Sequence, residues 1–194
     1  MSQYLRPIST VTAGSWTTSS ASLHDAIDEG IDNADDDASY ASESIENDDL
    51  EVKLSAGIDP LTDTLHVMYW RARRFGFYLM PIMSQVQLYQ GSTLIATGTG
   101  SHSDTISGSP PSKYSTASYT LTEAEASAIT DYTDLRLRIR YTASVGTASM
   151  RLTAAELVIP SIDTRASQKA EIAAPEVLGQ VAQPIARGQA VEVC

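Results

Sequence analysis

Cysteine is nearly absent from the sequence, which has one, Cys194, at its last position. An intrachain disulfide and a zinc site built from several cysteines are therefore excluded. Long apolar runs are absent too, because the most apolar stretch, residues 75–83, is far shorter than the roughly 18 residues that a membrane-spanning helix requires. No basic and then apolar signal peptide opens the sequence. We therefore expect a soluble protein, made in the cytosol, with no membrane partner.

Positive charge is also scarce in this chain. Its 13 Lys and Arg residues stand against 24 Asp and Glu residues, which gives a formal net charge of -11. A chain with this charge repels polyanions at long range, so we expect no nucleic-acid partner. The imbalance is strongest in residues 24–51, which contain twelve carboxylates and neither Lys nor Arg.

Apolar and polar residues alternate with a period of two from residue 50 onward, which is typical of half-buried strands. In residues 135–141 one strand face carries Leu, Leu, Ile and Tyr, and the other carries Arg136, Arg138 and Arg140. Gly91 is expected to begin a hairpin turn between two strands. The last strand is expected to end at Pro160.

The fold class follows from these strands and from the short connections between them. Parallel βαβ units need long helical crossovers, which the Gly-, Ser- and Pro-rich connections do not provide. Thr122 and Glu125 fit a capping box, which predicts one short helix or helical turn. We therefore predict an all-β protein: an antiparallel β-sandwich, jelly-roll-like, over residues 50–160.

The two flanks of the predicted sandwich show little periodicity. Residues 1–49 are polar and acidic, and we expect them to form an N-terminal arm with a short helix near residues 23–30. Residues 161–194 are rich in Ala, Gln and Val, and we expect an extended C-terminal arm. Both arms are expected to become ordered against another surface.

Two kinds of reactive site were tested against the sequence. The acidic stretch fits a calcium loop at Asp32, Asp36 and Glu43, but Asp37 occupies the position that requires glycine. A further set, Ser101, His102 and Asp104, lies in a Gly- and Ser-rich connection, where sequence neighbours rarely form a catalytic triad. We therefore expect no metal site, no cofactor and no catalytic residues.

The charge pattern itself predicts an assembly surface. Three like charges spaced two apart on one strand repel each other unless something negative lies over them. The acidic stretch, from the same or a neighbouring subunit, is the expected partner. This hypothesis assigns one interface to the following residues: Asp35, Asp36, Asp37, Arg136, Arg138 and Arg140.

Aromatic residues give an alternative hypothesis, because exposed rings on a β-sandwich can stack on sugars. Tyr69 and Trp70 are the candidate glycan-stacking residues. Rings that alternate within a strand are more often part of the core, so this function is the second choice.

Short motifs along the chain resemble a recurrent module of tailed bacteriophage virion proteins. They are "YLRPIST…GSW", "IDEG…DDDASY" and "YTLTEAEASAITDYTDLRLRIRYTAS…RLTAAELVIP", within residues 4–160. The resemblance implies an accessory structural protein of the virion: a head decoration or cement protein, a head fibre or a part of the tail. The segment from Ser161 onward departs from the pattern.

The resemblance and the absence of reactive sites lead to one expected function. The chain is expected to be a non-enzymatic capsid decoration protein that stabilises the phage head, in virions assembled in the host cytoplasm. Its expected partners are the major capsid protein or other virion proteins, and sister subunits in a homo-oligomer, with a trimer as the simplest symmetric arrangement. The alternative is a carbohydrate-binding tail or head-fibre module that contacts the host surface.

Overall fold

The computed structural model describes residues 1–75, 82–102, 114–143 and 149–162 of the chain. The chain divides into two units, Met1–Ile162 and Asp163–Cys194, and all of the described residues lie in the first. Its strands are β1 (Ser2–Leu5), β2 (Pro7–Thr12), β3 (Thr17–Thr18), β4 (Ala41–Glu43), β5 (Asp49–Leu54), β6 (Val67–Phe75), β7 (Ile82–Gln90), β8 (Thr93–His102), β9 (Ser115–Thr120), β10 (Leu135–Ala143) and β11 (Ser149–Pro160). The helices are a 3-10 helix, η1 (Ile31–Asn33), and α1 (Glu123–Ser127).

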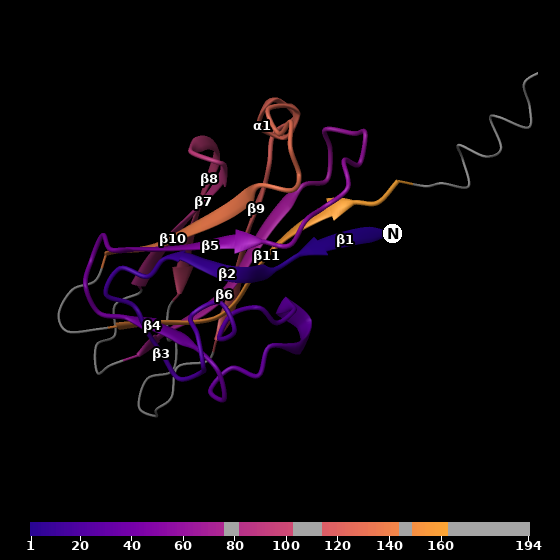
Figure 1. Cartoon of the computed structure of the whole chain (residues 1–194). Helices are drawn as coiled ribbons and strands as arrows, with labels where there is room; N and C mark the ends of the chain where they lie inside the picture. Colours follow the sequence, from indigo (N-terminus) through magenta and orange to yellow (C-terminus); the bar gives the residue numbers. More distant parts are fainter. Residues whose placement is uncertain (76–81, 103–113, 144–148, 163–194) are drawn as a thin grey trace, which may run out of the picture. The chain divides into compact units, whose positions relative to one another are not determined.

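The strands form two antiparallel sheets, which pack into a sandwich (Figure 1). One sheet contains β4-β11-β6-β9 and the other contains β5-β10-β7-β8. Counted in strands outward from the β7–β8 hairpin, each strand before the hairpin pairs with the strand at the same position after it. Thus β6 pairs with β9, β5 with β10 and β4 with β11. A long hairpin wrapped in this way is a jelly roll, and the predicted fold class is confirmed.

The N-terminal residues, which were expected to form an arm, lie within this sandwich. β1 pairs with the end of β11, β2 extends the second sheet beside β5, and β3 extends the first sheet beside β4. The compact unit therefore begins at Met1 and shows no division near residue 49. Residues 23–26 form turns rather than the expected helix. The expected C-terminal arm lies outside the described residues from residue 163 onward.

The core between the sheets follows the predicted alternation. The inward residues of β10, Leu135, Leu137, Ile139 and Tyr141, are fully buried. Trp70 of β6 is the largest fully buried side chain among the described residues, and a methyl group at Gly100 of β8 would lie 2.9 Å from its ring. Glycine at this position therefore makes room for the indole.

The capping box and the hairpin turn that the sequence predicted are both present in the structure. The Thr122 side chain accepts a hydrogen bond from the Glu125 backbone, and the Glu125 carboxylate accepts one from the Thr122 backbone, which completes the capping box of α1. Gly91 lies in the β7–β8 turn with φ of +56°. Within the described ranges, no helix is both long and apolar enough to cross a bilayer.

Candidate functional site

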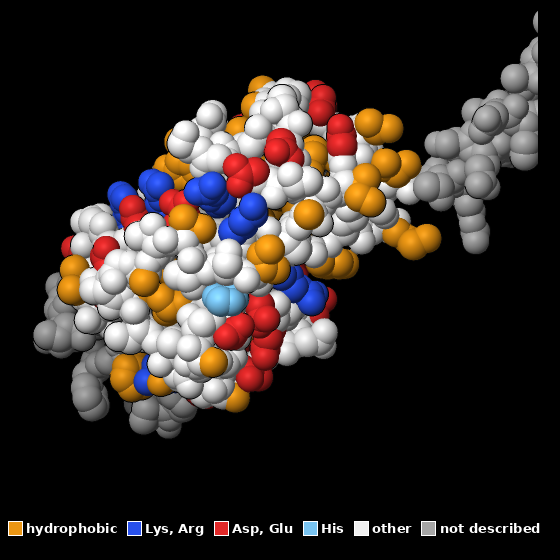
Figure 2. All heavy atoms as spheres, viewed as in Figure 1, with side chains coloured by type: hydrophobic (Ala, Val, Ile, Leu, Met, Phe, Trp, Pro, Cys, Tyr) orange, Lys and Arg blue, Asp and Glu red, His pale blue; other side chains and the backbone are white. Residues whose placement is uncertain are grey.

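The arginine ladder of β10 is neutralised by the strand next to it. Arg138 donates two hydrogen bonds, of 3.0 and 2.8 Å, to Glu51 of β5, and Arg140 donates two, of 2.6 and 2.7 Å, to Asp49. Arg136 lies 3.4 Å from Glu51. These hydrogen bonds raise the pKa of the Arg138 and Arg140 guanidinium groups. Figure 2 shows blue and red side chains interleaved on this part of the surface.

The aspartates at 35–37 have other partners, on the outer face of the first sheet. Asp36 accepts two hydrogen bonds of 2.7 Å from Arg71 of β6, and Asp37 pairs with the buried Arg73. Asp35 accepts hydrogen bonds from the backbone and the hydroxyl of Ser39. The structure therefore brings Asp36 and Asp37 to arginines of β6, and brings none of the three aspartates to the β10 ladder.

Rings and guanidinium groups alternate beside these ion pairs. The Arg151 guanidinium of β11 lies 4.0 Å from the centre of the Tyr40 ring and 3.7 Å from that of the Phe75 ring. The Arg73 guanidinium lies 4.7 Å from the centre of the Tyr114 ring. Such contacts between a cation and a ring are favourable and hold both groups in place. Burial raises the pKa of Tyr114 to about 12, so its hydroxyl stays protonated.

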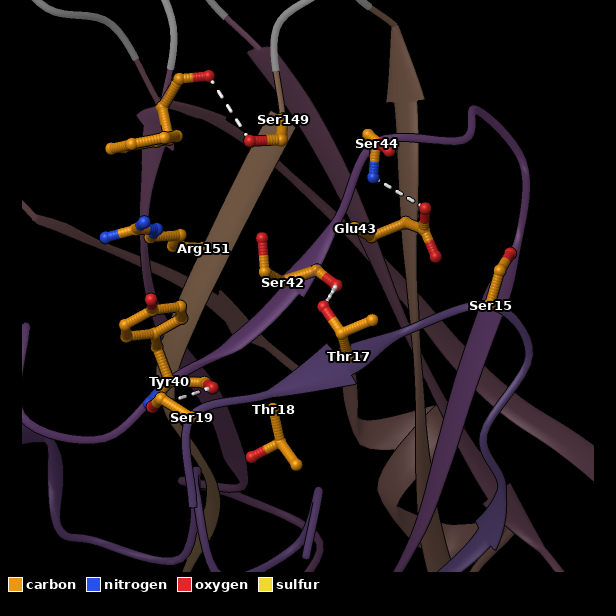
Figure 3. A pocket seen from close by; sticks show the side chains of 11 residues that line it. Ser15, Thr17, Thr18, Ser19, Tyr40, Ser42, Glu43, Ser44, Ser149 and Arg151 are labelled. Carbon is orange, nitrogen blue, oxygen red and sulfur yellow. Dashed lines mark hydrogen bonds between the residues drawn. The ribbon is translucent and has the colours of Figure 1, made fainter.

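A hollow of about 370 Å³ opens beside Arg151, and we call it the Arg151 hollow (Figure 3). Ser and Thr hydroxyls dominate its wall, together with two rings, one guanidinium and one carboxylate. The lining residues are Ser15, Thr17, Thr18, Ser19, Tyr40, Ser42, Glu43, Ser44, Phe75, Ser149 and Arg151. Figure 3 shows Arg151 and Tyr40 next to each other, with Ser42 and Thr17 to one side of them.

Glu43 is the carboxylate in this wall, and only 3% of its surface is exposed. Its Oε1 accepts hydrogen bonds of 2.5 Å from the backbone N–H groups of Ser44 and Ile45, while its buried Oε2 has no partner among the described residues. Asp48 is hydrogen-bonded by the Ser15 hydroxyl and backbone, and these bonds lower the pKa of Asp48. Among the described residues, no three His, Cys, Asp or Glu side chains are grouped to hold a metal.

An apolar loop, residues 58–65, lies at the end of the sandwich near the start of β1. Leu61 and Leu65 are 78% and 71% exposed, and Ile58 is 66% exposed. Both leucines have a left-handed backbone, with φ of +55° and +61°. Figure 2 shows orange side chains gathered at this end of the molecule.

His102 lies inside the sandwich and is not placed for catalysis. Its Nε2 lies 2.9 Å from the Ser84 hydroxyl and its Nδ1 lies 2.9 Å from the Ser115 hydroxyl. Ser84 also accepts a hydrogen bond of 2.8 Å from the Trp70 indole. Burial lowers the pKa of His102 to about 4. Asp104 lies outside the described residues.

The two residues expected to stack on a glycan point to opposite faces of the first sheet. Trp70 is fully buried in the core, so its ring is not accessible to a ligand. Tyr69 is half-buried on the outer face, beside Tyr4 and Glu156. Successive side chains of a strand point to opposite faces, and this alternation prevents a shared platform.

Sequence reasoning missed the Arg151 hollow and the apolar loop. The hollow combines residues from β3, β4, β6 and β11, which are distant in the sequence. One signal was present for the loop, because three large apolar residues, Ile58, Leu61 and Leu65, follow β5 between Asp, Thr and Pro residues.

Comparisons with known proteins extend only to the fold. No protein-family model matches the sequence, and no curated protein matches it. The chain is similar in structure to the Agl-KA catalytic domain, with 10% identity and a TM-score of 0.47, over 83% of this chain and 28% of that one. It is also similar to the K2 cleaved adhesin domain of Lys-gingipain, with 13% identity and a TM-score of 0.42, over 77% of this chain and 87% of that one.

A third similar structure is the enzymatically active domain of tailspike protein 4 of bacteriophage CBA120. The identity is 7% and the TM-score is 0.38, over 81% of this chain and 19% of that one. The chain thus spans less than a third of the Agl-KA and tailspike chains. Likeness at this level concerns the β-sandwich fold alone.

Proposed function

We propose that this chain is a non-enzymatic structural protein of a tailed-phage virion, and that it attaches to the capsid shell as a decoration or cement protein. The sequence motifs within residues 4–160 support the virion assignment. The observation that carries attachment is the apolar loop, with Leu61 and Leu65 held in solvent.

The apolar loop is costly for an isolated protein in two ways. A large apolar side chain that stays in water lacks the stabilisation of about 1.5–3 kcal/mol that burial would give it. A left-handed backbone adds roughly 1–2 kcal/mol for each residue other than glycine. Leu61 and Leu65 combine an exposed apolar side chain with a left-handed backbone. We infer that another protein surface covers this loop in the assembled particle.

The charges that the sequence assigned to an interface are largely used within the chain. The arginines of β10 and the aspartates at 36 and 37 are already paired within the chain. The contribution of Leu61 and Leu65 to attachment is expected to depend weakly on salt, because salt screens exposed charges, such as those of Asp59 and Asp63, and leaves apolar burial largely intact.

The test is co-sedimentation of the full chain with capsid shells assembled without it. Replacing both Leu61 and Leu65 by Ser is expected to reduce binding at least tenfold. The control is Leu94→Ser, which removes an exposed leucine from β8 and should leave binding unchanged. Absence of binding by the wild type, or equal binding by all variants, contradicts the proposal. Analytical ultracentrifugation of the same samples tests the expected trimer.

The alternative function, glycan binding by a tail or head-fibre module, does not have the platform that the sequence indicated, because Trp70 is buried. Among the described residues, the Arg151 hollow contains aromatic rings and is larger than a second hollow with rings, which contains Tyr4 and Tyr69.

A further inference from the structure

We propose that the Arg151 hollow is a carbohydrate-binding site, independent of the attachment to a shell. Its volume of about 370 Å³ lies in the range of small-ligand sites. Its wall offers the two kinds of contact that a sugar ring needs: ring faces for its C–H groups, and donors and acceptors for its hydroxyls.

The ring contacts come from Tyr40 and Phe75. Arg151 lies against both rings, so neither ring has to be ordered when a ligand arrives. Phe75 remains 46% exposed, which leaves apolar ring surface for a sugar. Aromatic rings provide large contact areas at a low cost in conformational entropy, which favours binding.

The polar contacts come from groups that have unused hydrogen-bonding capacity. Within the described part of the chain, the hydroxyls of Ser42, Ser44 and Tyr40 donate no hydrogen bond to other residues. Other hydroxyls of the wall already hold the strands together, such as Thr17 with the Ser42 carbonyl (Figure 3). Hydroxyls both donate and accept, as the hydroxyls of a sugar do.

The chemistry of the wall favours sugars over other ligands. A polyanion is disfavoured by the net charge of -11 and by the Glu43 carboxylate in the wall. An apolar ligand is disfavoured because Ser and Thr form most of the lining. A neutral carbohydrate fits both the rings and the hydroxyls.

Isothermal titration of the full chain with three neutral oligosaccharides, maltohexaose, cellohexaose and mannohexaose, tests this proposal. Saturable binding to at least one of these probes is expected. Phe75→Ala and the double change of Ser42 and Ser44 to Ala are each expected to weaken it at least fivefold. Phe75 is half-exposed and the serines carry no structural hydrogen bond through their hydroxyls, so these variants are expected to fold.

Tyr89→Ala provides the matched control. Tyr89 lies against Arg138 on the other sheet, with 4.4 Å between the guanidinium and the ring centre, so this variant removes an equivalent contact away from the hollow. It should bind every probe like the wild type. No saturable binding by the wild type to any probe, or unchanged affinity in both hollow variants, overturns the proposal. Shell co-sedimentation of the hollow variants stays normal in either case, which separates this proposal from the proposed attachment.

Discussion

Arg71 and Asp36 form a two-fold hydrogen-bonded pair, with both oxygens of the carboxylate 2.7 Å from the guanidinium nitrogens. Asp36 has a left-handed backbone, with φ of +56°, and its carbonyl oxygen lies 3.4 Å from the hydroxyl of the buried Thr153. The acidic loop is thus fixed to the outer face of the first sheet by β6 and β11. Asp36 and Asp37 of this loop are therefore paired with arginines of the same chain.

Asp36→Asn is expected to lower the free energy of unfolding by about 1–2 kcal/mol, because a paired arginine donates two charge-assisted hydrogen bonds only to a carboxylate. Urea unfolding measures the change. Asp28→Asn is the control, since Asp28 is exposed and makes no hydrogen bond or ion pair with a described residue. An equal, small effect in both variants would show that the loop is merely solvated.

Thr122→Ala is expected to lower the free energy of unfolding by about 1 kcal/mol, because it removes the hydroxyl that accepts the Glu125 backbone N–H. Thr133→Ala serves as a comparison, since it removes an exposed threonine hydroxyl bound to Asp131 in a turn near α1. Thermal unfolding of the two variants should show the larger loss for Thr122. A smaller loss for Thr122 than for Thr133 contradicts the assignment.

The features that the sequence predicted are local ones. Alternation identifies the buried face of β10, and the spacing of Thr122 and Glu125 identifies a helix start, because both depend on residues a few positions apart. Among the N-terminal strands, β3 and β4 were missed because they are two and three residues long, too short to show a period. β9 was missed because four of the six residues in its sequence, "STASYT", are Ser or Thr, so no apolar alternation marks it.

Pairing between distant residues could not be predicted. The sequence does not show which carboxylates of the acidic stretch lie beside the arginines of β10, because that depends on the register of β5 against β10. Asp49 and Glu51 lie opposite Arg140 and Arg138, so the ladder is neutralised within the sheet. Register is set by the whole fold, and spacing in a single strand does not contain it.

Replacing Leu61 by Gly is expected to leave the free energy of unfolding unchanged or to raise it by up to about 1 kcal/mol. Glycine adopts the left-handed backbone of this position without strain, and this gain offsets its greater freedom in the unfolded chain. Leu94→Gly, within β8, is expected to destabilise the protein instead. Urea unfolding of both variants checks the contrast. A marked loss for Leu61→Gly would mean that the Leu61 side chain contributes to the fold, against its exposure.

Acid is expected to destabilise the protein through His102 before it protonates most carboxylates. The pKa of this histidine is about 4 in the folded chain, because burial disfavours the charged ring and outweighs the opposite effect of the hydrogen bond with Ser115, and 6.5 is its ordinary value. The unfolded chain therefore binds more protons between these two values. The stabilisation is complete above about pH 6.5 and is lost as the pH falls toward about 4, and the full loss is about 3 kcal/mol.

His102→Gln tests this pH dependence. The variant is expected to be less stable at neutral pH, because it loses the fit between the two serines, but its free energy of unfolding should fall less steeply between about pH 6.5 and about pH 4. His66→Gln is the control, because burial also lowers the pKa of His66 but its ring bonds Tyr132 elsewhere in the core. His66→Gln should reduce the fall of the free energy of unfolding with pH by less than His102→Gln does. Urea unfolding across this pH range measures all three proteins, and parallel curves for the wild type and His102→Gln would exclude His102 as the source of the acid sensitivity.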